Sequence, residues 1–96
     1  MQWKWDPDKD RVNKRKHRVS FNTAILVFKD PLFLTEFNSY PYEERFQTMG
    51  MVNDDVILVI HTLNEGPFTA NTEAGRIISA RKATPQERKA YEEGAF

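Results

Sequence analysis

Two apolar stretches, residues 44–52 (ERFQTMGMV) and 56–63 (VILVIHTL), are separated only by Asn53, Asp54 and Asp55. Asn and Asp tolerate the backbone of a tight turn, and runs rich in Val, Ile and Phe favour β-strands. Strands joined by so short a turn must pair antiparallel, because a parallel connection needs a dozen or more residues. The sequence therefore predicts a β-hairpin at the centre of the fold.

Further strands are expected on both sides of this hairpin. Residues 2–5 (QWKW) alternate tryptophan with polar residues, residues 32–37 (LFLTEF) are another apolar run, and residues 76–82 (RIISARK) form a last strand. Residues 64–75 are rich in Gly, Pro, Asn and Thr without periodicity, which indicates a long exposed loop. The 96 residues allow one domain, residues 1–96, with one modest core.

The first and last helices are marked by their start signals. Asp6 precedes Pro7 as an N-cap before a first-turn proline, so a helix is expected over residues 7–17. That segment is nearly all polar, and Val12 alone is expected to face the core. Residues 84–87 (TPQE) have the pattern of a capping box for a last helix, which Gly94 closes.

A second helix is predicted to start at Ser20 and to end at Asp30 and Pro31. It carries an apolar stripe with the spacing of an α-helix: Phe21, Ala24, Ile25 and Phe28. The expected order is β-α-α-β-β-β-β-α. We predict an α+β fold in which an antiparallel sheet has the two N-terminal helices on one face and is followed by a C-terminal helix.

The net charge of zero conceals a segregation of charge along the chain. Residues 1–29 carry eight Lys and Arg against three Asp, residues 30–75 carry one Arg against eight acids, and residues 76–96 carry five against three. Such segregation produces a local basic surface able to meet phosphates. Solvated helix faces would explain the same pattern.

Several kinds of site are excluded or disfavoured by composition. The absence of cysteine excludes disulfides and Cys-ligated zinc, and two histidines 44 positions apart disfavour a histidine metal site, so we expect neither a metal nor a cofactor. The longest aliphatic run, residues 56–60, is far too short to cross a bilayer. We therefore expect a soluble, cytoplasmic protein without a membrane partner.

Alternation along the strands predicts one sheet face that the helices do not cover. On the last strand, Ile77, Ser79 and Arg81 should share a face opposite Ile78 and Ala80. On the strand at 44–52, Arg45 and Gln47 should share a face as well. A polar, partly cationic sheet surface suits an extended phosphate-bearing ligand or a partner chain.

Three segments resemble the BrnT family of type II toxins, small ribonucleases related to the RelE toxins: residues 5–31 (WDPDKDRVNKRKHRVSFNTAILVFKDP), 44–46 (ERF) and 76–94 (RIISARKATPQERKAYEEG). The tracts ISARKA and KHxVSF are the most specific parts of the similarity. The resemblance implies a RelE-like fold and metal-independent cleavage of RNA. It also implies neutralisation by a BrnA-type antitoxin, through which alone the toxin would be brought to DNA.

The chemistry of such an enzyme selects candidate residues. Without a metal, the 2′-hydroxyl of RNA attacks the adjacent phosphorus, so the protein must move protons and stabilise a pentacovalent phosphorane. Arginine suits the phosphorane because its planar fork matches two phosphoryl oxygens, and Arg81 is the first candidate. Lys82 and Arg76 are candidates for flanking phosphates, although both share the parity of Ile78 and would otherwise lie at the core-side rim.

The remaining candidates come from the strand at 44–52 and from single residues. Glu44 is a candidate general base if it is buried, and Arg45 is a candidate for orienting substrate; as neighbours on a strand they cannot share a face. His61 and Arg88 are candidate substrate-binding residues. For His61 a half-buried structural role competes, as does a helix-ending role for His17, and Tyr91 is a core anchor or an acid–base group. The competing function is a non-catalytic module that binds a protein or nucleic acid through the open sheet face.

Overall fold

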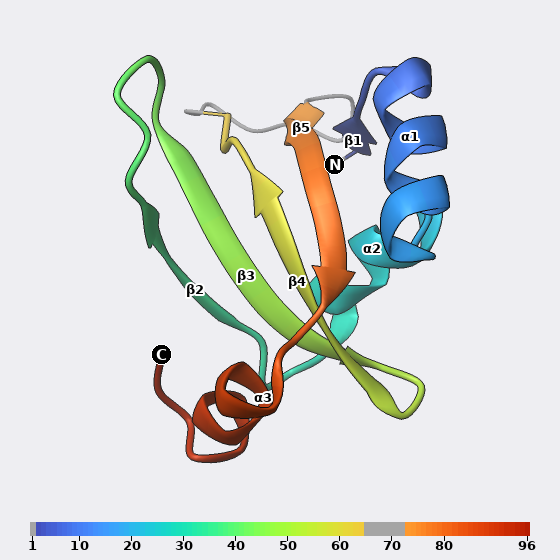
Figure 1. Ribbon diagram of the computed structural model, residues 1–96. Helices are drawn as coiled ribbons and strands as arrows, with labels where there is room; N and C mark the ends of the chain where they lie inside the picture. The colour runs from blue at the N-terminus through green and yellow to red at the C-terminus, as the bar shows by residue number, and fades with distance from the viewer. Residues whose placement is uncertain (1, 65–72) are drawn as a thin grey trace.

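The computed structural model describes residues 2–64 and 73–96. These residues form a five-stranded sheet in the order β1-β5-β4-β3-β2 (Figure 1). The strands are β1 (Gln2–Lys4), β2 (Leu34–Asn38), β3 (Arg45–Val52), β4 (Asp55–His61) and β5 (Glu73–Lys82). The helical segments are α1 (Pro7–His17), α2 (Phe21–Ala24), the 3-10 helix η1 (Ile25–Lys29) and α3 (Pro85–Glu92).

The sheet is mixed, and the predicted all-antiparallel sheet is therefore wrong at one edge. The predicted hairpin is confirmed, with Val52 paired to Asp55 across a two-residue turn in which Asn53 has a φ of 55°. Strands β2 to β5 pair antiparallel, but β1 pairs parallel with β5 through Trp3 opposite Gly75. Nearly the whole chain separates β1 from β5, so no short turn dictates the direction of their pairing.

The second helical segment differs from the single predicted helix. Ser20 is its N-cap and accepts a hydrogen bond from the Thr23 amide at 3.2 Å, but the α-helix lasts only four residues before it tightens into η1. A 3-10 helix has three residues per turn, so the buried stripe runs through Phe21, Ala24 and Val27 in steps of three. The expected order of elements is corrected by this extra segment.

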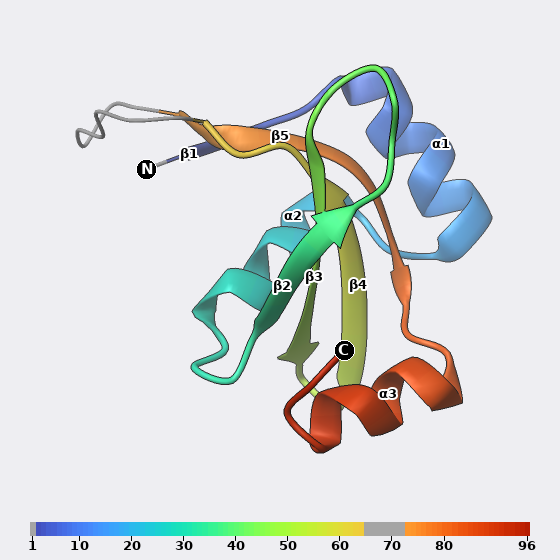
Figure 2. The same cartoon turned by 90° about the vertical axis from the view of Figure 1, so that its left-hand side faces the viewer.

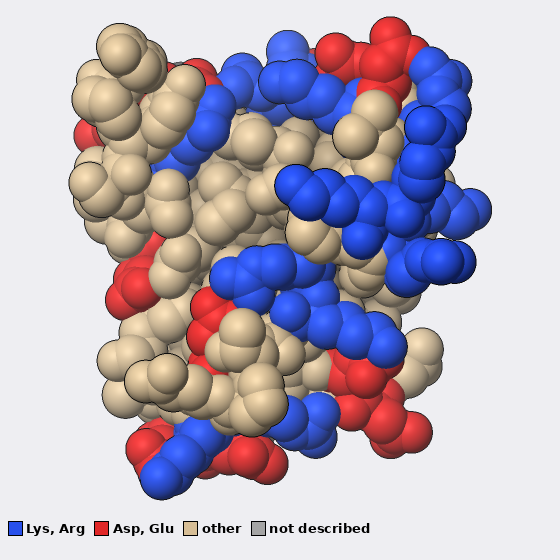
Figure 3. Space-filling model, viewed as in Figure 1, with Lys and Arg blue, Asp and Glu red and all other residues tan. Residues whose placement is uncertain are grey.

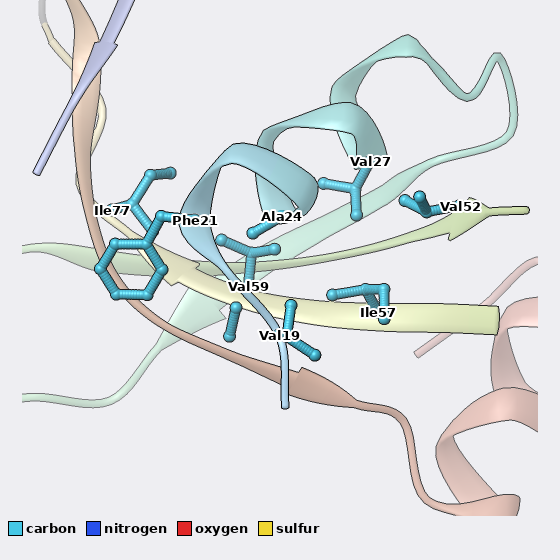
Figure 4. Packing of buried hydrophobic residues seen from close by; sticks show 9 residues of the cluster. Val19, Phe21, Ala24, Val27, Val52, Ile57, Val59 and Ile77 are labelled. Atoms are coloured by element: carbon cyan, nitrogen blue, oxygen red, sulfur yellow. The ribbon is translucent and has the colours of Figure 1, made fainter. Parts of the chain in front are cut away.

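The main core lies between this helical segment and the sheet. Figure 4 shows Phe21, Ala24 and Val27 packed on Val59 and Ile77, all of them nearly or fully buried. Gly50 of β3 makes the close approach of η1 possible, because a Cβ at that position would lie 2.7 Å from the Val27 Cβ. A second, smaller cluster lies on the opposite side of the sheet under α3 and includes Met49, Leu58 and Tyr91. Figure 2 shows α2 and α3 on opposite sides of the sheet.

Helix α1 lies at an edge of the sheet, so the prediction that both N-terminal helices cover one face is wrong. Val12, the residue expected to face the core, is 58% exposed, whereas Asn13 is 6% exposed. The Asn13 side chain donates to the Ala80 carbonyl at 2.8 Å and accepts from the Ala80 amide at 3.1 Å. It also donates to the Val19 carbonyl. A polar helix has no apolar stripe to bury, so α1 instead satisfies the free edge of β5 with one side-chain amide.

A β-bulge interrupts β5 at Ile78. Ser79 pairs with Ile60 of β4 and Ile77 pairs with His61, which leaves Ile78 as the extra residue. Ile77 and Ala80, three positions apart, are consequently both buried in the core beneath α2 and η1. The bulge interrupts the alternation of side chains between the two faces of the sheet along Arg76 to Arg81. The prediction that Ile77 lies on the uncovered face is therefore wrong.

The ends of β5 also correct the predicted loop. Glu73, Ala74 and Gly75 already belong to the strand, and the Asn64 amide donates to the Ala74 carbonyl at 2.8 Å. The rest of the loop expected over 64–75 lies outside the described residues. At the other end, Thr84 and Glu87 form the predicted capping box of α3, and Gly94 has a φ of +78° just beyond the helix.

The Asn13 contacts predict a large stability effect for one polar substitution. Asn13→Ala would leave three buried backbone groups without partners, so the free energy of unfolding should fall by about 2–3 kcal/mol in urea denaturation. The matched control is Val12→Ala on the same helix, which should change it by less than about 0.5 kcal/mol. Equal effects of the two substitutions would show that α1 is not held by this amide.

Candidate functional site on the open sheet face

The face of the sheet opposite α2 and η1, here called the open face, carries arginines from two strands. Arg45 lies at the start of β3, and Arg76 and Arg81 lie on β5. The bulge at Ile78 brings Arg76 to the same face as Arg81, although their separation of five residues would otherwise place them on opposite faces. Helix α3 covers only the end of this face nearest Arg81 (Figures 1 and 2).

Arg81 is held by the first turn of α3. Its Nη1 and Nη2 atoms donate to the two carboxylate oxygens of Glu87 at 2.7 and 3.0 Å, and Nη1 also donates to the Lys82 carbonyl at 3.3 Å. Glu87 in turn accepts from the Thr84 amide within the capping box. The hydrogen bond from Arg81 outweighs burial and lowers the pKa of Glu87 to about 2, and the same pair raises the pKa of Arg81.

Arg45 and Arg76 share a second carboxylate. The Glu43 Oε1 atom accepts from Arg45 Nε at 3.0 Å and from Arg76 Nη2 at 2.6 Å. The Arg45 guanidinium also lies over the ring of Tyr40, 3.6 Å from its centre, and its side chain is only 19% exposed. The hydrogen bond from Arg45 outweighs desolvation and lowers the pKa of Glu43, with Arg76 adding to the effect.

Strand pairing sets the distance between these two arginine groups. Phe46, His61 and Ile77 lie in one row across β3, β4 and β5. Arg45 precedes Phe46 and Arg76 precedes Ile77, so these two arginines are two strands apart, or about 10 Å. Arg81 lies opposite Leu58 of β4, and Arg76 lies opposite Thr62, which follows β4 and whose amide donates to the Arg76 carbonyl. Leu58 and Thr62 are four residues apart, so Arg76 and Arg81 are separated by about 13 Å along the strand direction. The open face thus offers two cationic positions along one extended track.

The other predicted cations and the predicted base lie outside this track. Lys82 pairs with Ile57 and its amino group lies 3.6 Å from Asp55, at the rim that its parity predicted. Glu44 is exposed just before β3, so it lacks the burial on which its role as a base was conditional. Arg88 donates to the Asp54 carbonyl at 3.0 Å and thereby links α3 to the central hairpin.

His61 lies on the covered face and is fully buried. Its Nδ1 is 2.9 Å from the Thr62 carbonyl and its Nε2 is 2.7 Å from the Thr48 hydroxyl, so both ring nitrogens have partners. Burial lowers the pKa of His61 and so favours the neutral form of the imidazole. Trp3 and Phe28 pack edge-on against the ring. This placement separates His61 from a polymer bound to the open face.

Tyr91 and His17 also have structural surroundings. The Tyr91 hydroxyl donates to Asp30, which also accepts from the Met51 amide. Burial, with Asp30 beside it, raises the pKa of Tyr91 to about 12. Burial opposes ionisation of Asp30, but the hydrogen bonds from Tyr91 and two backbone amides outweigh it, and the net result is a lowered pKa. His17 is the last residue of α1, at the helix end where it was predicted.

Sequence reasoning missed the carboxylates that hold the arginines. Glu87 was predicted only as part of a capping box, and its spacing of six residues from Arg81 across a strand–helix corner gave no sign of an ion pair. Glu43 lies outside the predicted strands and pairs with Arg76 across 33 positions. The adjacent sequence YPYEER, rich in aromatic and charged residues, was the only local signal.

Two further observations concern the described residues alone. Within residues 2–64 and 73–96, no group of three or more Asp, Glu or His side chains is placed to hold a metal ion. No helix in that part of the chain is long and apolar enough to cross a membrane.

The structure defines an α+β domain with arginines gathered on an uncovered sheet face. Guanidinium groups held in this way are chemically suited to phosphates. The comparison with known families is more specific. Residues 5–87 match the family described as the ribonuclease toxin BrnT of type II toxin–antitoxin systems, and the chain belongs to this family. No curated protein matches the sequence. Family membership implies an RNA substrate and an antitoxin partner.

The Arg81–Glu87 pair predicts a defined pH dependence of stability. The pKa of Glu87 is depressed from 4.5 to about 2, so its stabilising effect is complete above pH 4.5 and is lost as pH falls through 2. After discounting for solvent screening, Glu87→Gln should lower the free energy of unfolding by about 1–2 kcal/mol at pH 6. Gln keeps the capping hydrogen bonds, so the difference isolates the ion pair.

Denaturation of both proteins between pH 2 and 6 measures this difference, which should shrink towards zero at the acid end. The control is Glu92→Gln, which removes the exposed partner of Arg88 at 4.0 Å and should have almost no effect. A difference between wild type and Glu87→Gln that stays constant with pH would contradict the assigned ion pair.

Proposed function

We propose that this chain is a metal-independent endoribonuclease. The 2′-hydroxyl of RNA loses its proton and attacks the adjacent phosphorus, and the bond from phosphorus to the 5′-oxygen breaks, which leaves a 2′,3′-cyclic phosphate and a protonated 5′-hydroxyl. Membership of the ribonuclease toxin family supports RNA as the substrate. The observation that carries the mechanism is the fixed, carboxylate-held set of arginines on the open face. A RelE-like fold and action in the cytoplasm are parts of the same proposal.

Arg81 is proposed to stabilise the phosphorane. A guanidinium has five N–H donors. The contacts to Glu87 use one donor from each Nη atom, and the Lys82 carbonyl uses the second Nη1 donor. Among the described residues, Nε–H and the second Nη2–H have no partner, and these two donors form the side edge of the guanidinium. That edge matches two phosphoryl oxygens, while Glu87 keeps the group in place.

The other residues take supporting roles in this proposal. Arg76 and Arg45, held by Glu43, would bind phosphates about 13 Å further along the RNA and orient it across the sheet. Lys82 and Arg88, at the rim and on α3, would contribute positive potential near Arg81. Glu44, which is exposed beside Arg45, remains a candidate for proton transfer only if bound RNA covers it. His61 is left out because it is fully buried.

Two substitutions that break the same ion pair test the role of Arg81. Arg81→Ala removes the cation and should reduce the initial rate of RNA cleavage by about 10²–10³-fold, by analogy with the loss of an oxyanion donor. Glu87→Gln loosens the hold on Arg81 but leaves the cation, so it should lower the rate by only about tenfold or less. The assays are run with purified protein in EDTA, in which the wild-type rate should persist.

Stability controls complete this test. Arg81→Ala leaves the Glu87 carboxylate without its partner, so the melting temperature should fall in step with that of Glu87→Gln, although Arg81→Ala loses far more activity. Thr84→Ala removes the cap of α3 at a cost of about 1 kcal/mol and should stay active. Near-normal cleavage by Arg81→Ala, or equal losses in Arg81→Ala and Glu87→Gln, would make Arg81 a structural residue. Loss of wild-type activity in EDTA would contradict metal independence.

We also propose that a BrnA-type antitoxin neutralises the toxin by covering part of the open face and supplies the DNA-binding function of the complex. Ile77, which alternation had placed on this face, is buried in the core and cannot contact the partner. The polar track between Arg45 and Arg81 is therefore the proposed point of overlap, through charged rather than aliphatic contacts.

Competition measures this overlap directly. The purified toxin–antitoxin complex should cleave RNA much more slowly than the free chain, and Arg45→Glu should weaken antitoxin binding because it reverses a charge on the track. Lys29→Glu, at the end of η1 on the covered side, is the matched charge reversal and should leave binding nearly unchanged. A complex that cleaves as fast as free toxin would exclude overlap with the site.

A further inference from the structure

Two groups of positive charges, the arginines of the open face and the cations of α1, differ in their partners. Every arginine on the open face is paired with a carboxylate. On α1, in contrast, the ion pairs of the described residues include only Arg11 with Asp8. Lys9, Lys16 and their neighbours on this helix therefore remain available to an external anion. Figure 3 shows Lys and Arg side chains gathered over α1 and extending towards β5.

One side of α1 borders a groove at the edge of the open face. The groove has a volume of about 340 Å³ and lies between the helix and the bulged part of β5. Lys9, Lys16 and His17 line its helical side, and Ile78 and Ser79 line its strand side. Most of its lining is apolar, with Val12 contributing from the helix. The groove therefore combines an apolar floor with a cationic wall.

We propose that this groove binds single-stranded RNA next to the scissile phosphate, with Lys9 and Lys16 on backbone phosphates and a base over Val12 and Ile78. The inference rests on the proposed function, since it extends the same substrate beyond Arg81. Ser79 lines the groove and lies two residues from Arg81 on β5, so the groove lies beside the proposed site. Binding and catalysis are thereby assigned to different cations.

Charge and shape favour RNA over other occupants of this groove. Asp8 is the one carboxylate in its lining, and Arg11 neutralises it. A cationic wall beside an apolar floor is the combination that sequence-tolerant single-strand binding uses, because each nucleotide presents a phosphate and an apolar base face. The two sides of the groove, α1 and β5, are held together by the hydrogen bonds between the Asn13 side chain and the Ala80 backbone.

The test compares two double variants of one helix that remove the same charge. Lys9→Gln with Lys16→Gln changes the groove wall, whereas Lys14→Gln with Arg15→Gln changes residues outside its lining. The probe is a short fluorescein-labelled 2′-O-methyl RNA, which has no nucleophile and cannot be cleaved. Its Kd is measured by fluorescence anisotropy between about 50 and 200 mM salt.

We expect the groove pair to raise Kd about tenfold or more and to reduce the salt slope by about 1.4, the value for two lost phosphate contacts on a single strand. The control pair should change Kd by less than about threefold with the slope unchanged. Equal weakening by both pairs, no weakening by the groove pair, or no binding by wild type would overturn the proposal. Because the probe cannot react, failure here is distinct from failure of the Arg81 mechanism.

An acidic protein segment is the other occupant that the charges would accept. If the antitoxin alone binds the groove, the groove pair will weaken antitoxin binding while Kd for the 2′-O-methyl RNA stays at the wild-type value. That result also overturns the proposal.

Discussion

The extra residue in β5 determines which side chains the open face presents. Ile78 has no partner on β4, so the strand shifts its alternation between Ile77 and Ser79. Ile77 and Ala80 can then both enter the core beneath α2. On the other side, Arg76 and Arg81 can both face outwards and find carboxylates. Without the bulge, one of these two arginines would have to lie on the covered face, where a guanidinium is costly to bury.

The same segment of β5 also explains the position of α1. Beyond the short β1, no strand among the described residues pairs with the outer edge of β5, and an unpaired edge must be satisfied or covered. Asn13 does this with a single amide that bonds to both polar atoms of Ala80. The helix is thereby held beside the bulge, and its basic side meets Ile78 and Ser79. The Lys and Arg side chains of α1, which would only be solvated on an isolated helix, are thereby placed next to the arginines of the open face.

The sequence predicted the elements better than their assembly. The hairpin, the two capped helices and the last strand follow from local chemistry, because turn residues, caps and periodicity act within a few positions. The parallel pairing of β1 depends on contacts across almost the whole chain, and the anchoring of α1 by Asn13 depends on an edge that no local pattern marks. Both were missed for that reason.

The candidate site shows the same division. Arg45 and Arg81 were placed on the open face correctly, because each lies in a regular part of its strand. The position of Arg76 was obscured by the bulge, and Glu43 was missed because its partners come together only when β3 and β5 occupy one sheet. His61 was expected half-buried and is fully enclosed, since Trp3 and Phe28 arrive from segments distant in sequence.

The central claim is that RNA lies along the open face, with a phosphate at the side edge of Arg81. A crystal structure of the protein with an uncleavable 2′-O-methyl RNA tests this most directly. The account predicts phosphoryl oxygens within hydrogen-bond distance of Arg81 Nε and Nη2, Glu87 still paired with Arg81, and RNA continuing towards Arg76 and Arg45. RNA bound on the covered face, or bound without a phosphate at Arg81, would contradict it.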